Sequence, residues 1–155
     1  MQGFSTDIAK FCDKYKVDMK VAVRKIAFEA FKRVILKTPV DTGRARANWG
    51  VAVGQPNMVM KVTEGDKTGT ITLTKAKDGV WSWLCQGSIF LTNNLPYIGV
   101  LEYGGYPNPP KVGTIMKGKK FGEIRSVNGF SRQAPNGMVR VTVEEMRAWV
   151  QGAIK

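Results

Sequence analysis

The sequence predicts an α+β protein that folds as a single domain over residues 1–155. Three observations lead to this class. Apolar residues recur at three- and four-residue spacing over residues 5–37, as expected of a long amphipathic helix, and this spacing returns near the C-terminus. Between them, short alternating or β-branched runs are typical of strands in a small antiparallel sheet. An apolar content of 43% over 155 residues is sufficient for one buried core.

The first predicted element is a long amphipathic helix from Ser5, a suitable N-cap, to about Lys37. Asp18 could cap a second segment, so a kink or division at Val17–Asp18 is an open alternative. The helix is expected to end before Pro39, because a residue that precedes proline is biased away from helical geometry.

Residues 38–49 are expected to form a tight turn followed by one turn of helix. The Asp-Thr-Gly run at 41–43 consists of turn formers, whereas the Arg-Ala-Arg-Ala run at 44–47 has high helix propensity. Trp49 follows this turn and is expected to anchor it in the core.

The middle of the chain is predicted to contain the strands. Residues 51–53 and 58–62 alternate between apolar and other residues, as half-buried strands do. Residues 70–74, Thr-Ile-Thr-Leu-Thr, are predicted to form a strand because β-branched residues dominate the run. A short helix is expected between residues 76 and 87, and residues 89–92 are expected to form a strand.

Residues 91–105 are predicted to form a turn and a short helix. Asn93 and Asn94 favour a turn after the preceding strand, and Pro96 suits the first turn of a helix. Gly104–Gly105 ends the helix. The apolar residues of this segment share one helical face, so that face is expected to be buried while Glu102 is carried to the surface.

Glu102 is flanked by aromatic residues at the end of this short helix, namely Tyr97, Tyr103 and Tyr106. A carboxylate in this setting could act as a catalytic acid, or it could belong to a docking corner. An ion pair with Arg132 or Arg140 is a further alternative.

The C-terminal third begins with a basic insertion and ends with a helix. Residues 106–128 are rich in proline, glycine and lysine, which predicts a long exposed loop or an extended hairpin. Val139, Val141 and Val143 alternate as a strand would. Thr142 and Glu145 then form a capping box for a closing amphipathic helix.

The net charge of +12 indicates an anionic partner, either nucleic acid, an anionic membrane or an acidic protein. The absence of histidine excludes histidine-based triads and histidine-ligated zinc. Cys12 and Cys85 are expected to be reduced thiols. No nucleotide-binding glycine motif or carboxylate cluster is present, so no cofactor or metal is predicted. No run is long and apolar enough for a membrane span, which predicts residence in a cytoplasm.

Basic side chains together with aromatic residues favour one alternative function, sequence-nonspecific nucleic-acid binding. No helix-turn-helix, zinc or RNA-binding motif accompanies them. A small hydrolase that uses Glu102 is the other alternative.

Three segments, residues 38–49, 91–104 and 133–142, resemble the neck or tail-completion family of tailed bacteriophages, which is related to minor tail protein Z of lambda-like phages. The resemblance implies a structural virion protein and no enzyme activity. It implies a ring, six-fold or twelve-fold, that joins the head-side connector or adaptor to a tail terminator, tube or sheath protein. Genomic DNA passes through the lumen of such a ring in the virion, after assembly in the host cytoplasm.

The resemblance also implies subunit or partner contacts at the matched turns. These contact residues are Asp41, Thr42, Gly43, Arg44, Tyr97, Glu102, Tyr103 and Arg132. The chain departs from the family pattern at the insertion 106–128, which is expected to reach a neighbouring subunit, the tail or DNA. Its basic residues are Lys111, Lys117, Lys119, Lys120 and Arg125.

Overall fold

The structure is a computed structural model that describes residues 3–59, 64–109 and 125–154. It confirms the α+β class, with helices flanking a small antiparallel sheet. In chain order, the elements of the described residues are α1 (Phe4–Tyr15), α2 (Met19–Lys37), α3 (Arg44–Ala47), β1 (Gly50–Val53), α4 (Thr70–Ser82), β2 (Ile89–Thr92), α5 (Ile98–Tyr103), β3 (Ser126–Val127), β4 (Phe130–Ser131) and α6 (Val139–Ile154).

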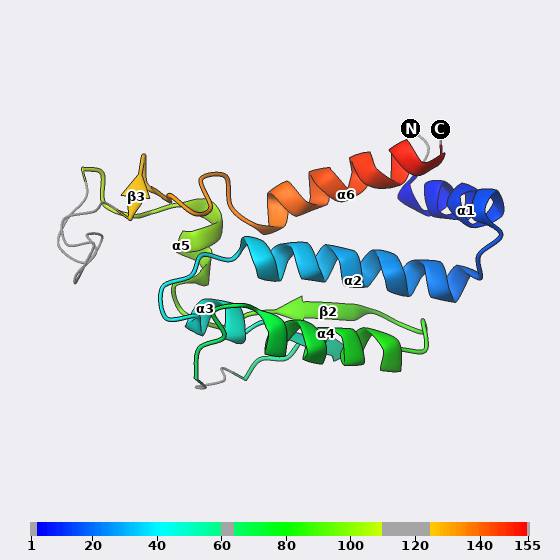
Figure 1. Ribbon diagram of the computed structural model, residues 1–155, viewed down its shortest axis with the longest axis horizontal. Coiled ribbons are helices and arrows are strands. Elements are labelled where there is room, and N and C mark those ends of the chain that lie inside the picture. The colour runs from blue at the N-terminus through cyan, green and yellow to red at the C-terminus, as the bar shows by residue number, and fades with distance from the viewer. Residues whose placement is uncertain (1–2, 60–63, 110–124, 155) are drawn as a thin grey trace.

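Helix α2 runs through the middle of the molecule, as Figure 1 shows. Helices α1 and α6 pack against one of its sides, and α4 packs against the other together with the two-stranded β1–β2 sheet. Helix α5 and strand β3 lie at the end of the molecule opposite the two chain termini (Figure 1). Ile26 of α2 packs with Met146 and Val150 of α6 in one buried cluster, so the two longest helices share a core.

The long N-terminal helix is divided, as the alternative based on Asp18 predicted. The Asp18 carboxylate accepts hydrogen bonds from the backbone N–H groups of Lys20 at 2.9 Å and Val21 at 3.1 Å, and so caps α2. Lys16, at the end of α1, has a left-handed backbone with a φ of 50°. One prediction is wrong at the other end, because Gly3 and not Ser5 precedes the first turn of α1.

The predicted strand at residues 70–74 is wrong, because these residues form the first turns of α4. The buried Asp66 carboxylate accepts hydrogen bonds from Gly69 N–H at 2.8 Å and from Thr72, through N–H at 2.8 Å and Oγ1 at 2.9 Å. These bonds satisfy donors at the helix start, and Thr72, Ala76 and Val80 form the buried face of α4. The helix expected after residue 76 is the second half of the same element.

Replacing Asp66 with alanine is expected to destabilise the protein by about 2 kcal/mol, because it removes the acceptor for buried donors at the start of α4. Urea denaturation followed by circular dichroism measures the change. Asp78→Ala is the control, since Asp78 is an exposed aspartate in the same helix, and it is expected to change stability by less than about 0.5 kcal/mol. Equal losses in the two variants would contradict the capping role.

Strands β1 and β2 pair antiparallel, with a register from Gly50 opposite Thr92 to Val53 opposite Ile89. This pairing confirms the predicted strands at 51–53 and 89–92. The predicted strand at 58–62 is not confirmed, because residue 58 lies outside any strand and residues 60–63 lie outside the described residues. Strands β3 and β4 pair antiparallel as a short hairpin.

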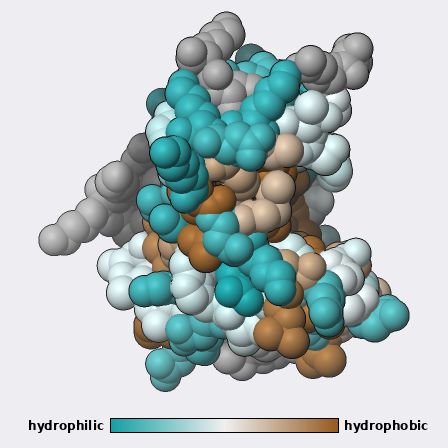
Figure 2. Space-filling model, turned by 90° about the vertical axis from the view of Figure 1, so that its right-hand side faces the viewer, coloured by the Kyte–Doolittle hydropathy of each residue, from teal (hydrophilic) through white to brown (hydrophobic). Residues whose placement is uncertain are grey.

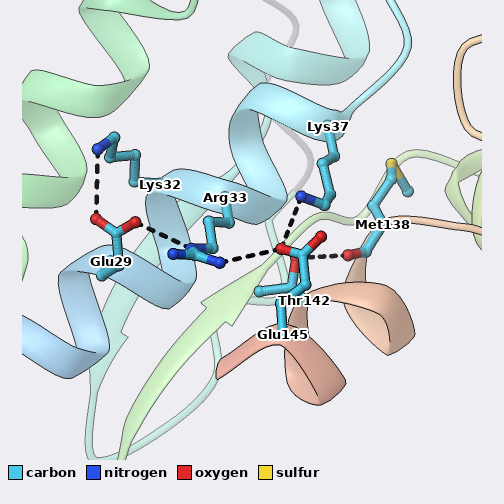
Figure 3. Close-up of polar contacts among 7 residues, drawn as sticks. All are labelled: Glu29, Lys32, Arg33, Lys37, Met138, Thr142 and Glu145. Atoms are coloured by element: carbon cyan, nitrogen blue, oxygen red, sulfur yellow. Dashed lines mark hydrogen bonds and ion pairs between the residues drawn. The ribbon is translucent and has the colours of Figure 1, made fainter. Parts of the chain in front are cut away.

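The predicted strand at Val139–Val143 is also wrong, because α6 begins at Val139. The proposed capping box fails with it. The Thr142 side chain is buried within the helix and donates from Oγ1 to the Met138 carbonyl at 2.7 Å, while Glu145 forms ion pairs with Arg33 and Lys37 of α2 (Figure 3). The group that caps α6 comes from another part of the chain and is described below.

No helix among the described residues is long and apolar enough to cross a membrane. The same residues contain no group of three cysteine, aspartate or glutamate side chains arranged to hold a metal ion. Cys12 and Cys85 are both free thiols.

Candidate functional site at the Glu102 corner

The three segments 38–49, 91–104 and 133–142 meet in one buried cluster, which we call the Glu102 corner. Each segment contributes at least one buried residue. The buried members are Ala45, Leu95, Leu101, Ala134 and Met138, and the partly buried residues packed against them are Trp49, Ile98 and Tyr106. The predicted anchoring of Trp49 is therefore confirmed. The sequence alone did not indicate that the three segments share one cluster.

Polar side chains also join these segments across long stretches of sequence. The Gln133 amide donates to the Val40 carbonyl at 2.9 Å and accepts from the Val40 N–H at 2.8 Å. The Asn93 amide donates to the Ala45 carbonyl at 2.8 Å. The paired Gln133–Val40 bonds fix both the distance and the orientation of their two segments, and the Asn93 bond links the third. Together these bonds hold the corner as one unit.

Glu102 lies at the centre of the corner and is buried, which corrects the prediction that it is carried to the surface. Its Oε2 accepts hydrogen bonds from the N–H groups of Met138 at 2.7 Å and Val139 at 2.9 Å. Its Oε1 accepts from the N–H of Arg140 at 3.0 Å and from Nε of the same residue at 3.3 Å. Glu102 therefore caps α6 from a distant part of the chain, and the predicted ion pair with Arg140 is confirmed.

The pKa of Glu102 follows from these contacts. Burial by itself raises the pKa of this carboxyl, but the N–H groups of Met138, Arg140 and Val139 and the Arg140 side chain outweigh it and lower the pKa below the ordinary value of 4.5. The carboxylate is therefore ionised at neutral pH and its oxygens are engaged. A general acid must carry a proton and reach a substrate, so the geometry suits a brace rather than a proton donor.

Stability is expected to fall below about pH 4.5, because a carboxyl with a lower pKa in the folded protein than in the unfolded chain stabilises the fold only while it is ionised. Glu102 is of this kind, and so is Glu145, whose pKa is lowered chiefly by the Lys37 ammonium. Their contributions are complete above about pH 5 and are lost as the pH falls through the lowered pKa values. Urea midpoints measured from pH 7 to pH 3 check this.

Glu102→Gln separates the contribution of Glu102 to this pH dependence from that of the other carboxyl groups. The variant is expected to be less stable than the wild type at pH 7 and to lose less stability on acidification, since the glutamine does not titrate. Glu144→Gln, at an exposed position, is expected to leave the acid loss unchanged. An acid loss in Glu102→Gln as steep as that of the wild type would contradict the assignment.

The matched turn at 41–44 lies at the edge of the corner. Gly43 is buried with a φ of 86° and precedes α3, while Asp41, Thr42 and Arg44 are exposed. Asp41 forms an ion pair with Arg125 through two contacts, Nη1 to Oδ2 at 2.7 Å and Nη2 to Oδ1 at 3.3 Å. The structure thus joins the turn to the base of the basic insertion, a contact that no local sequence signal indicates.

Three further predicted contact residues, Tyr97, Tyr103 and Arg132, are exposed. The Tyr103 ring is 70% exposed and the Arg140 guanidinium lies over it, 5.2 Å from the ring centre. Arg140 thus contacts both the buried Glu102 carboxylate and the exposed Tyr103 ring.

The basic insertion leaves and re-enters the protein beside α5. The N–H groups of Gly105 and Tyr106 donate to the Gly129 carbonyl at 2.9 and 3.0 Å, which closes its base. Lys111, Lys117, Lys119 and Lys120 lie outside the described residues, and so does the choice between a loop and an extended hairpin over 110–124. Arg125 is described and is part of the closed base.

No family model, curated protein or solved structure matches this chain.

Proposed function

We propose that the protein is a structural component of the neck of a tailed bacteriophage, where its copies form a ring that joins the head-side connector or adaptor to the tail. One observation carries the proposal. The three segments that carry the family resemblance are brought together at the Glu102 corner, and Asp41 of one of them forms an ion pair with Arg125 at the base of the basic insertion. A braced corner at the base of the insertion suits an assembly role, since contacts between subunits require rigid geometry.

The charge of the chain supports the same role. A ring around DNA must neutralise phosphate without reading sequence, and a net charge of +12 with no sequence-reading motif fits that requirement. Closure of a ring needs a heterologous interface, in which different surfaces of adjacent copies meet. The tail-side partner in this proposal is a terminator, tube or sheath protein, and the ring has six-fold or twelve-fold symmetry.

Deletion of the gene from its phage tests the proposal. Infected cells are expected to accumulate DNA-filled heads and separate tails, and electron microscopy of the lysate shows both. Complementation with the wild-type protein should restore joined virions. Normal virions in the absence of the protein would refute the proposed role.

Sequence-nonspecific nucleic-acid binding is a second candidate, favoured by the uneven charge along α2. In the C-terminal half, Lys32, Arg33 and Lys37 are neutralised by Glu29 and Glu145 (Figure 3). Near the α1–α2 junction the exposed lysines have no acidic partner in the described part of the chain. These residues are Lys16, Lys20 and Lys25. This end of the molecule presents extensive hydrophilic surface interrupted by hydrophobic patches (Figure 2).

This candidate predicts that the isolated monomer binds duplex DNA in a salt-dependent way. Lys20→Gln and Lys25→Gln are each expected to reduce the slope of log affinity against log salt by about one. Lys32→Gln is the control, because Lys32 is already paired with Glu29. Fluorescence anisotropy with a labelled duplex at several salt concentrations gives the slope. Absence of binding by the monomer at low salt would exclude this candidate.

A further inference from the structure

An apolar groove of about 490 Å³ lies between α2, β2 and α6, beside the Glu102 corner, with which it shares Trp49 and Val139. Most of its lining is apolar. The lining residues are Ala30, Phe31, Val34, Trp49, Leu91, Val139, Thr142, Val143, Met146 and Arg147. Val139 and Val143, on its α6 side, are 38% and 45% exposed, so the groove is open to solvent. A hydrophobic surface of this shape is typical of a site that another chain covers.

The edge of the sheet at this groove indicates an occupant in extended conformation. Gly54 N–H donates to the Ser88 carbonyl at 2.8 Å in the β1–β2 register. Hydrogen-bonded and non-hydrogen-bonded pairs alternate along an antiparallel ladder, so Leu91, opposite Val51, belongs to a non-hydrogen-bonded pair. Its backbone N–H and C=O therefore face the outer edge of β2, and no strand of the described residues pairs with that edge.

A segment of suitable chemistry begins and ends at the base beside α5. Residues 110–124 contain five large apolar residues in fifteen positions, which are Val112, Ile115, Met116, Phe121 and Ile124. The residues that lead into it, 107–109, are all exposed. A fifteen-residue segment that folded back on itself would span about 24 Å, at roughly 3.4 Å per residue.

We propose that the groove between α2, β2 and α6 receives residues 110–124 of a neighbouring copy of this chain. Apolar side chains of the incoming segment fill the groove, and its backbone pairs with the free edge at Leu91, as in strand addition to a sheet. In a ring built in this way each copy both gives and receives a segment, so the interface is heterologous. This inference rests on the proposed ring and names the contact that closes it.

Cysteine cross-linking between full-length chains tests the inference. Cys12→Ala and Cys85→Ser provide a thiol-free background. One chain then carries Val143→Cys in the groove, and a second chain, with a larger tag, carries Ile115→Cys. After mixing, a bismaleimide is expected to yield a mixed dimer, which contains one chain with the larger tag and one chain without it. The absence of a mixed dimer would overturn the inference. A third chain that carries both substitutions is the control, and if the bismaleimide cross-linked it only within single chains, that result would also overturn the inference.

Two arginine substitutions provide a matched pair for the groove. Val139→Arg places a charge in the groove and is expected to lower the yield of mixed dimer about tenfold. Val21→Arg is the control, because Val21 is also 38% exposed and also lies in the first turn of a helix, but it does not line the groove. Equal yields in the two variants would overturn the inference.

The two proposals fail separately. If the mixed dimer forms but phage without the gene assemble normally, the groove contact stands and the neck role is wrong. If the gene is required for joining but no mixed dimer forms, the neck role stands and the ring closes through another surface.

Discussion

Replacing Glu102 with alanine is expected to destabilise the protein by about 3 kcal/mol, because buried donors at the start of α6 lose a charged acceptor. The same change leaves the Arg140 guanidinium without its carboxylate. The loss arises between two segments far apart in sequence, so it is expected to appear in the global unfolding transition. Urea denaturation at pH 7, followed by both circular dichroism and tryptophan fluorescence, measures it.

Glu144→Ala is the matched control for this result. Glu144 is also a glutamate paired with an arginine, but its side chain is 72% exposed and so is most of Arg147, at 61%. Exposed pairs of this kind contribute little, so the control is expected to change stability by less than about 0.5 kcal/mol. If Glu102→Ala lowered the stability no more than Glu144→Ala does, Glu102 would not be the brace of the corner.

Gly43→Ala is expected to cost about 3 kcal/mol or more, for two separate reasons. The φ of 86° lies in the left-handed region, where a side chain is strained by roughly 1 to 2 kcal/mol. A Cβ at this position would also lie 2.6 Å from Lys67 N and 2.7 Å from Asp66 C, both backbone atoms that cannot move aside cheaply. Thermal and urea unfolding of the variant give the loss.

Gly54→Ala isolates the first of these reasons. Gly54 has nearly the same φ, 80°, but a Cβ there would meet nothing within 4 Å. Its expected cost is about 1 kcal/mol, from backbone conformation alone. The difference in lost unfolding free energy between the two variants then gives the part of the Gly43→Ala cost that arises from steric overlap with the segment that caps α4. Equal costs would show that this approach contributes nothing.

Where neighbouring residues alone determine the conformation, the sequence was sufficient to predict it. The turn before α3 follows from Asp-Thr-Gly at 41–43. The cap at Asp18 divides the first helix, a division that the sequence indicated only as an alternative to one continuous helix. Helix α5 ends at Gly104, as predicted. Both strands of the β1–β2 sheet were also predicted from their alternating or β-branched residues.

Both wrong strand predictions concern runs of β-branched residues, at 70–74 and 139–143. In each case a carboxylate outside the run, Asp66 for the first and Glu102 for the second, accepts hydrogen bonds from N–H groups at the helix start. Such bonds outweigh a difference in intrinsic propensity of a few tenths of a kcal/mol per residue. The Glu102 carboxylate comes from more than thirty residues away, so propensity within the run could not reveal it.

The sequence by itself determined the class of this protein, its charge, its turns and the three segments that resemble a neck protein. Only the tertiary structure decided that these segments form one corner and that Glu102 is a buried brace. It alone showed the apolar groove between α2, β2 and α6. The physical reason is that turns and caps depend on adjacent residues, whereas burial and the pairing of a charge depend on which distant segments meet when the core forms.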